Sequence, residues 1–516
     1  MDGWLLKKNT IIKGTLILTA AGFITRIIGF FYRIYLSNTL GTVNLGIYQL
    51  IFPVYGIAFT LYAGGIQTAV SKMVADEHGR SPKKGGTNQN IKRILKTGIG
   101  TAFLIAFTLS VLLFFNANFV ASALLKEKAC AGSLKVLAFV FPFCSITAGI
   151  NGYYYGLNRP GIPAFTQLFE QLVRVVTVYF IALAVSKGNQ PFTCELAVFG
   201  VLAGEAASSF FNMASMLFSK KPFPEGTSPE EKPIPVLRPL VEYALPLTGN
   251  HLIISVLNSV EAVLIPAMLK KYGMTTAEAL SVYGVLTGMS LPFIMFPSTI
   301  TNSLSVLLLP AVSEANAGRN HSLINQTTRT CIQYCLIIGI FSTGIFIIFG
   351  SALGSLFFHN KLAGQFLMIL AWLCPFLYLA TTLGSIINGL GKTYITLINS
   401  VTGLMIRIMF VLYMVPQKGI YGYLIGLLVS TLSIAFLDYL SLKHQIPFKF
   451  DAIDWMVKPI LIMCVLGFLV SKGYVYVVSL SLCPKMLVLA GSCFLILFLY
   501  VIALTAANCI RTDDFH

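Results

Sequence analysis

The chain has 516 residues, of which 56% are hydrophobic and only 11% are charged, and its mean hydropathy is +0.79. A soluble protein of this size carries far more surface charge, so the composition excludes a soluble domain and indicates an integral membrane protein. The net charge of +17 would suggest nucleic acid as the partner of a soluble protein. In a membrane protein it is explained by cytoplasmic loops that face anionic lipid, so we expect membrane lipids and no nucleic acid as partners.

Apolar windows about as long as the ~20 residues that cross a bilayer core recur along the whole chain. They predict an all-α polytopic membrane protein with 14 transmembrane helices. The first window is too long for the core of a signal peptide, so we expect a retained span. The windows are 11–36, 45–70, 97–120, 134–156, 163–186, 194–218, 240–269, 281–308, 330–356, 366–388, 393–414, 420–441, 457–478 and 485–507.

Lysine and arginine are unevenly shared between the two membrane sides that these windows define. The side that holds both termini has 22 of them, and the other side has 10. Because cytoplasmic loops are enriched in these residues, we expect both termini in the cytoplasm.

An internal repeat divides most of the chain into two similar parts. "FPFCSITAGINGYYYG" (141–156) is echoed by "CPFLYLATTLGSIINGLG" (374–391), and the window after each contains one arginine, Arg174 or Arg407. The repeat predicts two pseudo-symmetric six-helix lobes, at 1–218 and 240–442, joined by a cytoplasmic linker loop at 219–239. A C-terminal helix pair follows at 443–516. Parallel repeats of this kind suit transporters that rock about a central site.

Four arginines lie inside predicted windows, where an arginine costs about 2.5–3.5 kcal/mol to insert. Arg33 follows Arg26 by two helical turns on one face, and it either lines a cavity or extends to the outer interface. Arg174 has Glu170 one turn earlier, so this pair either neutralises itself or presents a cation to a ligand. Arg407 has no acidic residue in its own window and requires another helix, a cavity or a ligand. The planar guanidinium fork suits a phosphate ligand.

The carboxylates inside the windows allow two interpretations. Glu170, Glu205 and Asp438 are candidate charge partners across helices. The alternative is that one carboxylate binds a coupling cation, and Glu261, with Asn258 one turn before it, is the preferred candidate for that role.

Catalysis and a resident cofactor find no support in the sequence. The six histidines form no HExxH pair, no P-loop is present, and the ten cysteines include no CxxC pair. We therefore expect no catalytic residue, no metal site and no cofactor. Prolines inside the windows are the expected bend points of the helices, and they are Pro142, Pro246, Pro292, Pro297 and Pro375.

The stretches "KGTLILTAAGFITRIIGFFYRIYLSNTLG" (13–41), "GIYQLIFPVYGIAFTLYAGGIQTAVSKMVADE" (46–77) and "AGINGYYYGLNRPGIPAF" (148–165) resemble the stage V sporulation protein B family. That family belongs to the polysaccharide-exporter branch of the multidrug/oligosaccharidyl-lipid/polysaccharide (MOP) superfamily, which includes lipid II flippases. The resemblance implies two six-helix lobes around a V-shaped cavity, and two extra C-terminal helices that form a groove for a polyprenyl tail.

The resemblance also implies roles for individual residues. Flippase relatives have an arginine at the position of Arg26 in a pattern SRxxGFxR, similar to "TRIIGFFYR" here, which has one more residue before Arg33. Sodium-using relatives place carboxylates in the seventh and eleventh spans, where this chain has Glu261 and then Asn399 and Thr402. Coupling to Na⁺, coupling to H⁺ and drive by the membrane potential all stay open.

The intramembrane arginines and the resemblance together predict an alternating-access flippase or exporter in the bacterial cell membrane. Its expected cargo is an undecaprenyl-pyrophosphate-linked glycan for spore cortex or cell envelope, with Arg26, Arg33, Arg174 and Arg407 binding the pyrophosphate. Proteins of cell-envelope synthesis are the expected partners. A multidrug or cation antiporter is the main alternative, although it would prefer acidic residues in the chamber. A polyprenyl-phosphate glycosyltransferase or ligase is a further alternative function. Such an enzyme usually needs a catalytic carboxylate or a large outer loop.

Overall fold

The computed structural model describes residues 2–80, 88–218, 235–318, 320–446, 448, 450–480, 484–507 and 509. Within these ranges all regular structure is helical, with 20 α-helices and a few short π- and 3₁₀-helical turns, which confirms the predicted all-α fold. Twelve described helices are long and apolar enough to cross a membrane, or thirteen if the bent pair at 130–156 counts as one span. The first of them, Thr19–Gly79, contains most of the first predicted window and all of the second, so the total of 14 remains a prediction.

The chain divides into two compact units, Met1–Ala267 and Met268–His516. Most of the seventh predicted window therefore belongs to the first unit. The lobe boundaries drawn from the repeat remain a prediction, and most of the proposed linker, 219–234, lies outside the described residues.

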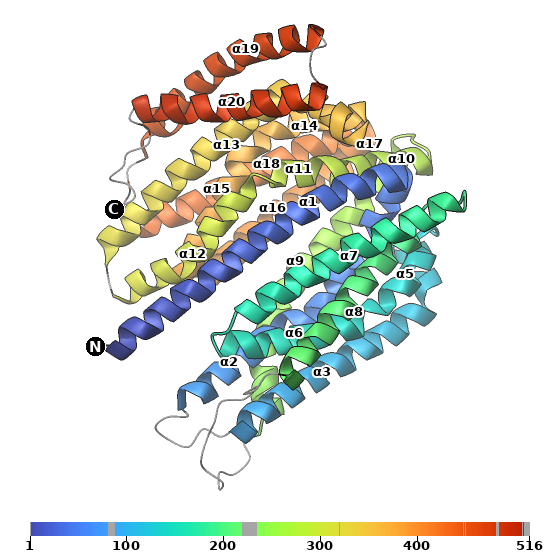
Figure 1. Ribbon diagram of the computed structural model, residues 1–516, viewed down its shortest axis with the longest axis vertical. Helices are drawn as coiled ribbons and strands as arrows, with labels where there is room; N and C mark the ends of the chain where they lie inside the picture. The colour runs from blue at the N-terminus through green and yellow to red at the C-terminus, as the bar shows by residue number, and fades with distance from the viewer. Residues whose placement is uncertain are drawn as a thin grey trace. The chain divides into compact units, whose positions relative to one another are not determined.

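The first unit is built from long helices that lie alongside one another, shown in blue to green in Figure 1. Its α-helices are α1 (Asp2–Phe59), α2 (Gly65–Arg80), α3 (Asn88–Phe115), α4 (Ala117–Phe119), α5 (Cys130–Ala138), α6 (Val140–Gly156), α7 (Gly161–Lys187), α8 (Cys194–Phe218) and most of α9 (Leu237–Lys271). Helix α1 is interrupted at Gly41, whose φ of 73° is a conformation that favours glycine. This interruption separates the first two predicted windows.

The core of the first unit depends on small residues where helices cross. A Cβ at Gly152 of α6 would lie 2.6 Å from the carbonyl oxygen of Gln67 in α2, and one at Gly98 of α3 would lie 2.4 Å from Val70. Larger residues at these points would push the helices apart, so glycine permits the close packing that membrane helices need. Around these crossings Val70, Tyr153 and neighbouring apolar residues form a buried cluster.

The second unit is also entirely helical in its described part. Its α-helices are α10 (Thr276–Gly284), α11 (Leu291–Met295), α12 (Ser298–Ala317), α13 (His321–Phe358), α14 (Lys361–Leu370), α15 (Cys374–Gly389), α16 (Thr393–Tyr413), α17 (Val415–Lys418), α18 (Ile420–Gln445), α19 (Lys458–Ser479) and α20 (Lys485–Ala506).

Local sequence explains several helix ends in the second unit. Helix α13 ends at Phe358, because the next residue, His359, has a left-handed φ of 51°. The Asn360 side chain then accepts hydrogen bonds from the first amides of α14. The predicted window 281–308 is divided, because α11 ends at Met295 and α12 begins after Pro297. Proline has no N–H to donate within a helix, which accounts for the interruption.

The last two long helices, α19 and α20, pack on each other and along α13 (Figure 1). A Cβ on Gly344 of α13 would lie 2.2 Å from Met463 of α19, and the Tyr500 hydroxyl of α20 donates to the carbonyl of Ile337 at 3.4 Å. Exposed apolar side chains such as Phe468 and Phe494 cover the outside of the pair, as expected for helices that face lipid.

Candidate functional site

Arg26 and Arg33 both lie on α1, and both side chains are exposed. The adjacent side of this part of α1 buries Ala21, Tyr32 and Leu36. A Cβ on Gly29 would lie 3.6 Å from the Gln171 side chain, so α1 packs directly against α7 there. The two arginines therefore lie one above the other at the edge of the face by which α1 packs. Neither has an ion pair with a carboxylate in the part of the chain that the structure describes.

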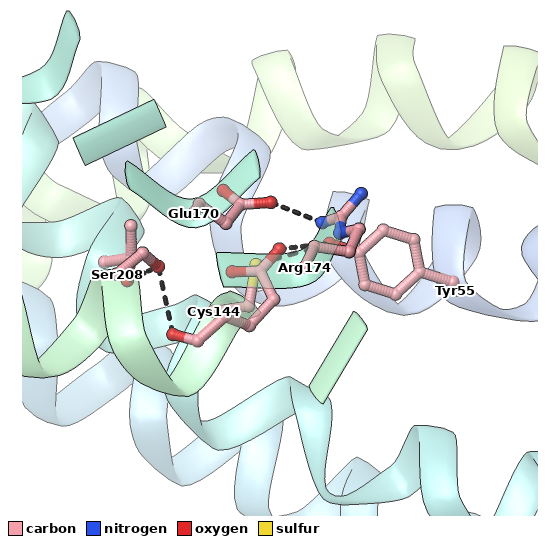
Figure 2. A network of polar contacts seen from close by, with 7 residues as sticks. Tyr55, Cys144, Glu170, Arg174 and Ser208 are labelled. Atoms are coloured by element: carbon pink, nitrogen blue, oxygen red, sulfur yellow. Dashed lines mark hydrogen bonds and ion pairs between the residues drawn. The ribbon is translucent and has the colours of Figure 1, made fainter. Parts of the chain in front are cut away.

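Arg174 in α7 forms an ion pair with Glu170 one turn earlier, and Figure 2 shows the two side chains facing each other. About a fifth of each side chain is exposed, 19% for Arg174 and 20% for Glu170. The i,i+4 pair expected from the sequence is thus present. Its partial exposure leaves the guanidinium within reach of a ligand.

A second carboxylate, Glu205 of α8, lies near Arg174 and is buried. The Tyr55 hydroxyl of α1 donates to Glu205 Oε1 at 3.3 Å and also lies 3.5 Å from Cys144 Sγ of α6 (Figure 2). A Cβ on Gly204 would lie only 3.0 Å from the Glu170 carbonyl oxygen and 3.2 Å from Arg174 Cβ. The glycine therefore lets α8 approach closely enough to place Glu205 beside Arg174.

Arg33 also belongs to this charge cluster, which we define as Arg33, Glu170, Arg174 and Glu205. Arg33 and Arg174 are close enough for their charges to repel each other. Tyr48, which is buried, lies near both arginines. The first unit thus brings together two cations and two carboxylates from α1, α7 and α8.

Interhelical hydrogen bonds fix the helices around the charge cluster. Thr166 of α7 donates to Asn212 of α8 at 2.7 Å, and Asn212 donates to Asn151 of α6 at 3.2 Å. The hydroxyls of Thr147 and Ser208 lie 3.2 Å apart (Figure 2). These bonds join α6, α7 and α8 on one side of the cluster and limit how far its charged side chains can separate.

Arg407 lies in α16 of the second unit, where it is half-buried. Asn399 of the same helix donates to Asp438 Oδ1 of α18 at 2.8 Å, and both residues are buried. Thr402 is exposed, and its hydroxyl donates to the carbonyl of Ile398 in its own helix. Asp438 therefore has an amide partner within the second unit, and Asn399 and Thr402 make separate contacts.

The other cation candidates lie on α9 in the first unit. Glu261 is buried, whereas Asn258 is exposed. Helix α9 contacts α1 and the π-helical turn after it: Ser259 donates to the Pro53 carbonyl at 3.2 Å, and the hydroxyls of Ser255 and Thr60 lie 2.9 Å apart. Among the described residues, no group of three or more His, Cys, Asp or Glu has the arrangement of a metal site.

The sequence did not point to the tyrosines beside the charge cluster, because a tyrosine in an apolar window resembles an ordinary core residue. One signal was available: Tyr48, Tyr55 and Tyr62 recur every seven residues, the same spacing as Arg26 and Arg33. A polar hydroxyl repeated along one helix face indicates a polar line inside the protein.

Comparison with known proteins places the chain in a family. A family described as polysaccharide biosynthesis protein matches residues 11–316. Stage V sporulation protein B of Bacillus subtilis (strain 168) is 25% identical over 480 residues, which cover 92% of this chain and 91% of that protein. Lipid II flippase MurJ of the same organism is 21% identical over 484 residues, which cover 89% of this chain and 87% of MurJ. The resemblance drawn from the sequence is confirmed.

Solved structures share the fold. A lipid II flippase MurJ in an inward closed conformation matches with a TM-score of 0.71 and 15% identity, covering 96% of this chain and 100% of that one. An inward-facing multidrug resistance MATE transporter of the MOP superfamily matches with a TM-score of 0.61 and 15% identity, and the match covers 84% of this chain and 98% of that transporter. The protein therefore crosses the membrane several times and has the fold of these transporters. Because the family match spans more than half of its residues, the chain belongs to the polysaccharide biosynthesis protein family.

Proposed function

We propose that this protein is an alternating-access flippase that moves an undecaprenyl-pyrophosphate-linked glycan from the inner to the outer leaflet of a bacterial cell membrane. The family description, the similarity to lipid II flippase MurJ over most of both chains and the transporter fold support this function. A peptidoglycan precursor or a polysaccharide repeat unit fits as the glycan, and the similarity to a sporulation protein favours a role in the spore envelope.

The observation that carries the proposal is the charge cluster of the first unit. Arg33 and Arg174 are permanent cations on neighbouring membrane helices, and they are close enough to repel each other. Two guanidinium groups near each other favour an anionic ligand, and a pyrophosphate offers two anionic groups to their planar forks. Arg26, two turns before Arg33 on the same side of α1, extends the cationic line.

The two carboxylates of the cluster have different parts in this proposal. Glu205 is buried and hydrogen-bonded to Tyr55, so it is a fixed polar neighbour of Arg174 that an arriving phosphate does not displace. Glu170 is about one-fifth exposed at its side chain, so it is the counter-ion that an arriving phosphate can replace on Arg174. Glu170 stays on α7, so the added charge of the phosphate is offset by Arg26 and Arg33, and the net charge in the membrane remains low during binding.

The remaining site candidates complete the proposal. In the second unit, Arg407 is a further cation available to an anionic ligand, and the apolar pair α19 and α20 guides the polyprenyl tail. Either a cation bound through Glu261 or the membrane potential supplies the driving force, and no resident cofactor takes part.

The direct test is translocation of a fluorescent polyprenyl-pyrophosphate-linked glycan in proteoliposomes, measured by leaflet-specific quenching. We expect Arg174→Gln, Arg33→Gln and Arg26→Ala each to slow translocation at least tenfold, because each removes a charge-assisted phosphate contact. Arg238→Gln is the matched control, since Arg238 forms an i,i+4 pair with Glu242 at 2.8 Å but is exposed. Full translocation by correctly inserted Arg174→Gln and Arg26→Ala proteins would overturn the assignment.

A drug or cation antiporter is the second candidate, favoured by the buried carboxylates Glu205 and Asp438. The same vesicles decide between the two functions. An antiporter would move a cationic dye against an imposed Na⁺ or H⁺ gradient and leave the lipid-linked glycan in place. The flippase moves the glycan and not the dye.

A further inference from the structure

A pocket of about 320 Å³ lies in the second unit, where the ends of several membrane-spanning helices meet. Its polar lining consists of Asn316, His321, Lys392, His444 and Gln445, and the remaining lining residues are aliphatic. His321 is the first residue of α13, Gln445 is the last residue of α18, and Lys392 lies between α15 and α16. The pocket therefore lies at one end of these helices.

The local backbone directs these groups to the pocket. Gly391, with a φ of 80°, turns the chain sharply after α15, and the Lys392 amide donates back to the carbonyl of Ile387 at 3.2 Å. The side chain of Asn320 caps α13 by accepting from the amide of Leu323 at 3.1 Å. The start of a 38-residue helix, which carries partial positive charge, thus adds to the field of Lys392.

The polar lining is suited to an anion. Lys392 is a cation, both imidazoles have N–H groups to donate, and the amides of Asn316 and Gln445 add further donors. No described lining residue is acidic, and within the described residues Lys392 forms no ion pair with a carboxylate. A half-buried lysine without an acidic neighbour, in a pocket of donors, is what a phosphate group needs.

A buried cluster of aliphatic and aromatic residues lies beside the pocket. Ile324 and Ile446 of the pocket belong to a buried cluster that includes Trp455. Tyr439 packs edge to face on Phe450, and Phe450 on Trp455. The orientation predicted from the lysine and arginine count places these helix ends at the cytoplasmic leaflet.

We propose that this pocket binds a phosphate group, carried by the head group of an anionic phospholipid at the membrane surface, with Lys392 as the main contact. The bound phosphate joins the start of α13, the turn between α15 and α16 and the end of α18. This site is separate in the fold from the charge cluster of the first unit and does not depend on the substrate proposed for that cluster.

Native mass spectrometry of the full-length protein tests the proposal, with phosphatidylglycerol as the probe and phosphatidylcholine as the zwitterionic comparison. We expect wild type to retain phosphatidylglycerol in preference to phosphatidylcholine. Lys392→Gln with His444→Gln should weaken retention about tenfold, and His321→Gln, an exposed and milder change, about threefold. Lys443→Gln is the matched control, because Lys443 neighbours His444 but lies over the Tyr439 ring outside the pocket lining.

Competition with inorganic phosphate distinguishes a phosphate group on a lipid from a soluble phosphate ligand. Phosphatidylglycerol that excess phosphate does not displace indicates a lipid site, whereas stabilisation by phosphate alone, lost in Lys392→Gln, indicates a soluble phosphate ligand. Equal retention of phosphatidylglycerol by wild type, the double variant and His321→Gln, with no stabilisation by phosphate, would overturn the proposal.

Discussion

Two helix pairs that the sequence repeat matches, α7 with α8 and α16 with α18, use the same position differently. Arg174 and Arg407 correspond in the repeat, and the residue four positions earlier is Glu170 in one and Gly403 in the other. Glu170 pairs with its arginine, whereas a Cβ on Gly403 would lie 2.4 Å from Ile434 of α18. One copy of the scaffold uses this position for a charge, and the other uses it for close helix packing.

Two turns before these arginines, the charge lies in the other unit: the second unit has a carboxylate there, and the first unit has only neutral groups. Thr166 and Asn399 each lie eight residues before the arginine of their helix. Thr166 bonds the neutral Asn212 at 2.7 Å, and Asn399 bonds the carboxylate of Asp438 at 2.8 Å. A duplicated fold can thus keep its interhelical contacts while it moves its carboxylates to different depths. The first unit concentrates its charge beside the arginine, where a phosphate ligand is proposed to bind.

The largest effect on stability is expected from Arg174→Ala, which leaves Glu170 and Glu205 without their cation. Breaking a buried ion pair costs 3–5 kcal/mol, and partial exposure places this one at about 3 kcal/mol of the free energy of unfolding. Denaturant unfolding in detergent measures it. The double variant Arg174→Ala with Glu170→Gln should recover part of the loss, and an unchanged stability of the single variant would show that the cluster is not held by charge.

The different partners of Asn399 and Asn212 predict that replacing these two asparagines lowers the free energy of unfolding by different amounts. Asn399→Ala should cost about 2 kcal/mol because it removes the donor of a buried carboxylate, and Asn212→Ala about 1 kcal/mol because its partners are neutral. Unfolding of the two variants under identical conditions provides the comparison. Equal losses of unfolding free energy in the two variants would mean that the hydrogen bond from Asn399 stabilises Asp438 no more than a bond between neutral groups.

The close approach of α8 to α7 predicts that Gly204→Ala costs about 1.5 kcal/mol, since the added Cβ meets backbone and Arg174. Gly100→Ala in α3 is the control, because apart from the backbone of its own helix no heavy atom lies within 4 Å of its Cβ position. That control should be neutral or slightly stabilising. The shift in unfolding temperature reports both, and a neutral Gly204→Ala would argue against tight packing at the charge cluster.

The smallest effect is expected for Tyr55→Phe, which removes the hydroxyl that donates to Glu205. Hydrogen bonds between membrane helices contribute about 0.6 kcal/mol on average, so the loss should be near that value. Tyr179→Phe, at an exposed tyrosine, is the control for loss of a hydroxyl alone. A large loss for Tyr55→Phe would give this tyrosine a greater part in holding Glu205 than its 3.3 Å bond suggests.

Much of the fold follows from the sequence because the membrane imposes a simple rule on it. Apolar windows predicted the helices, and Gly41 accounts for the separation of the first two. The window 281–308 predicts one helix where the structure has a break between α11 and α12. Hydropathy averages over residues and does not register the missing N–H of Pro297.

The candidate site was predicted only in part. The pair of Glu170 and Arg174 followed from helix spacing alone. Glu205, Tyr55 and Arg33 join it through packing between α1, α7 and α8, and the pair of Asn399 with Asp438 through packing of α16 on α18. Contacts between helices depend on which faces meet, and hydrophobic periodicity in a chain apolar on nearly all sides does not specify that.

The central claim is that Arg174 receives the substrate phosphate in exchange for Glu170. Its most direct test is the affinity of the purified protein for polyprenyl pyrophosphate, measured by native mass spectrometry for wild type, Glu170→Gln and Arg174→Gln. We predict that Glu170→Gln binds the lipid about fivefold more tightly, since the competing carboxylate is gone, and that Arg174→Gln binds it about tenfold more weakly. Identical affinities for the three proteins would contradict the claim.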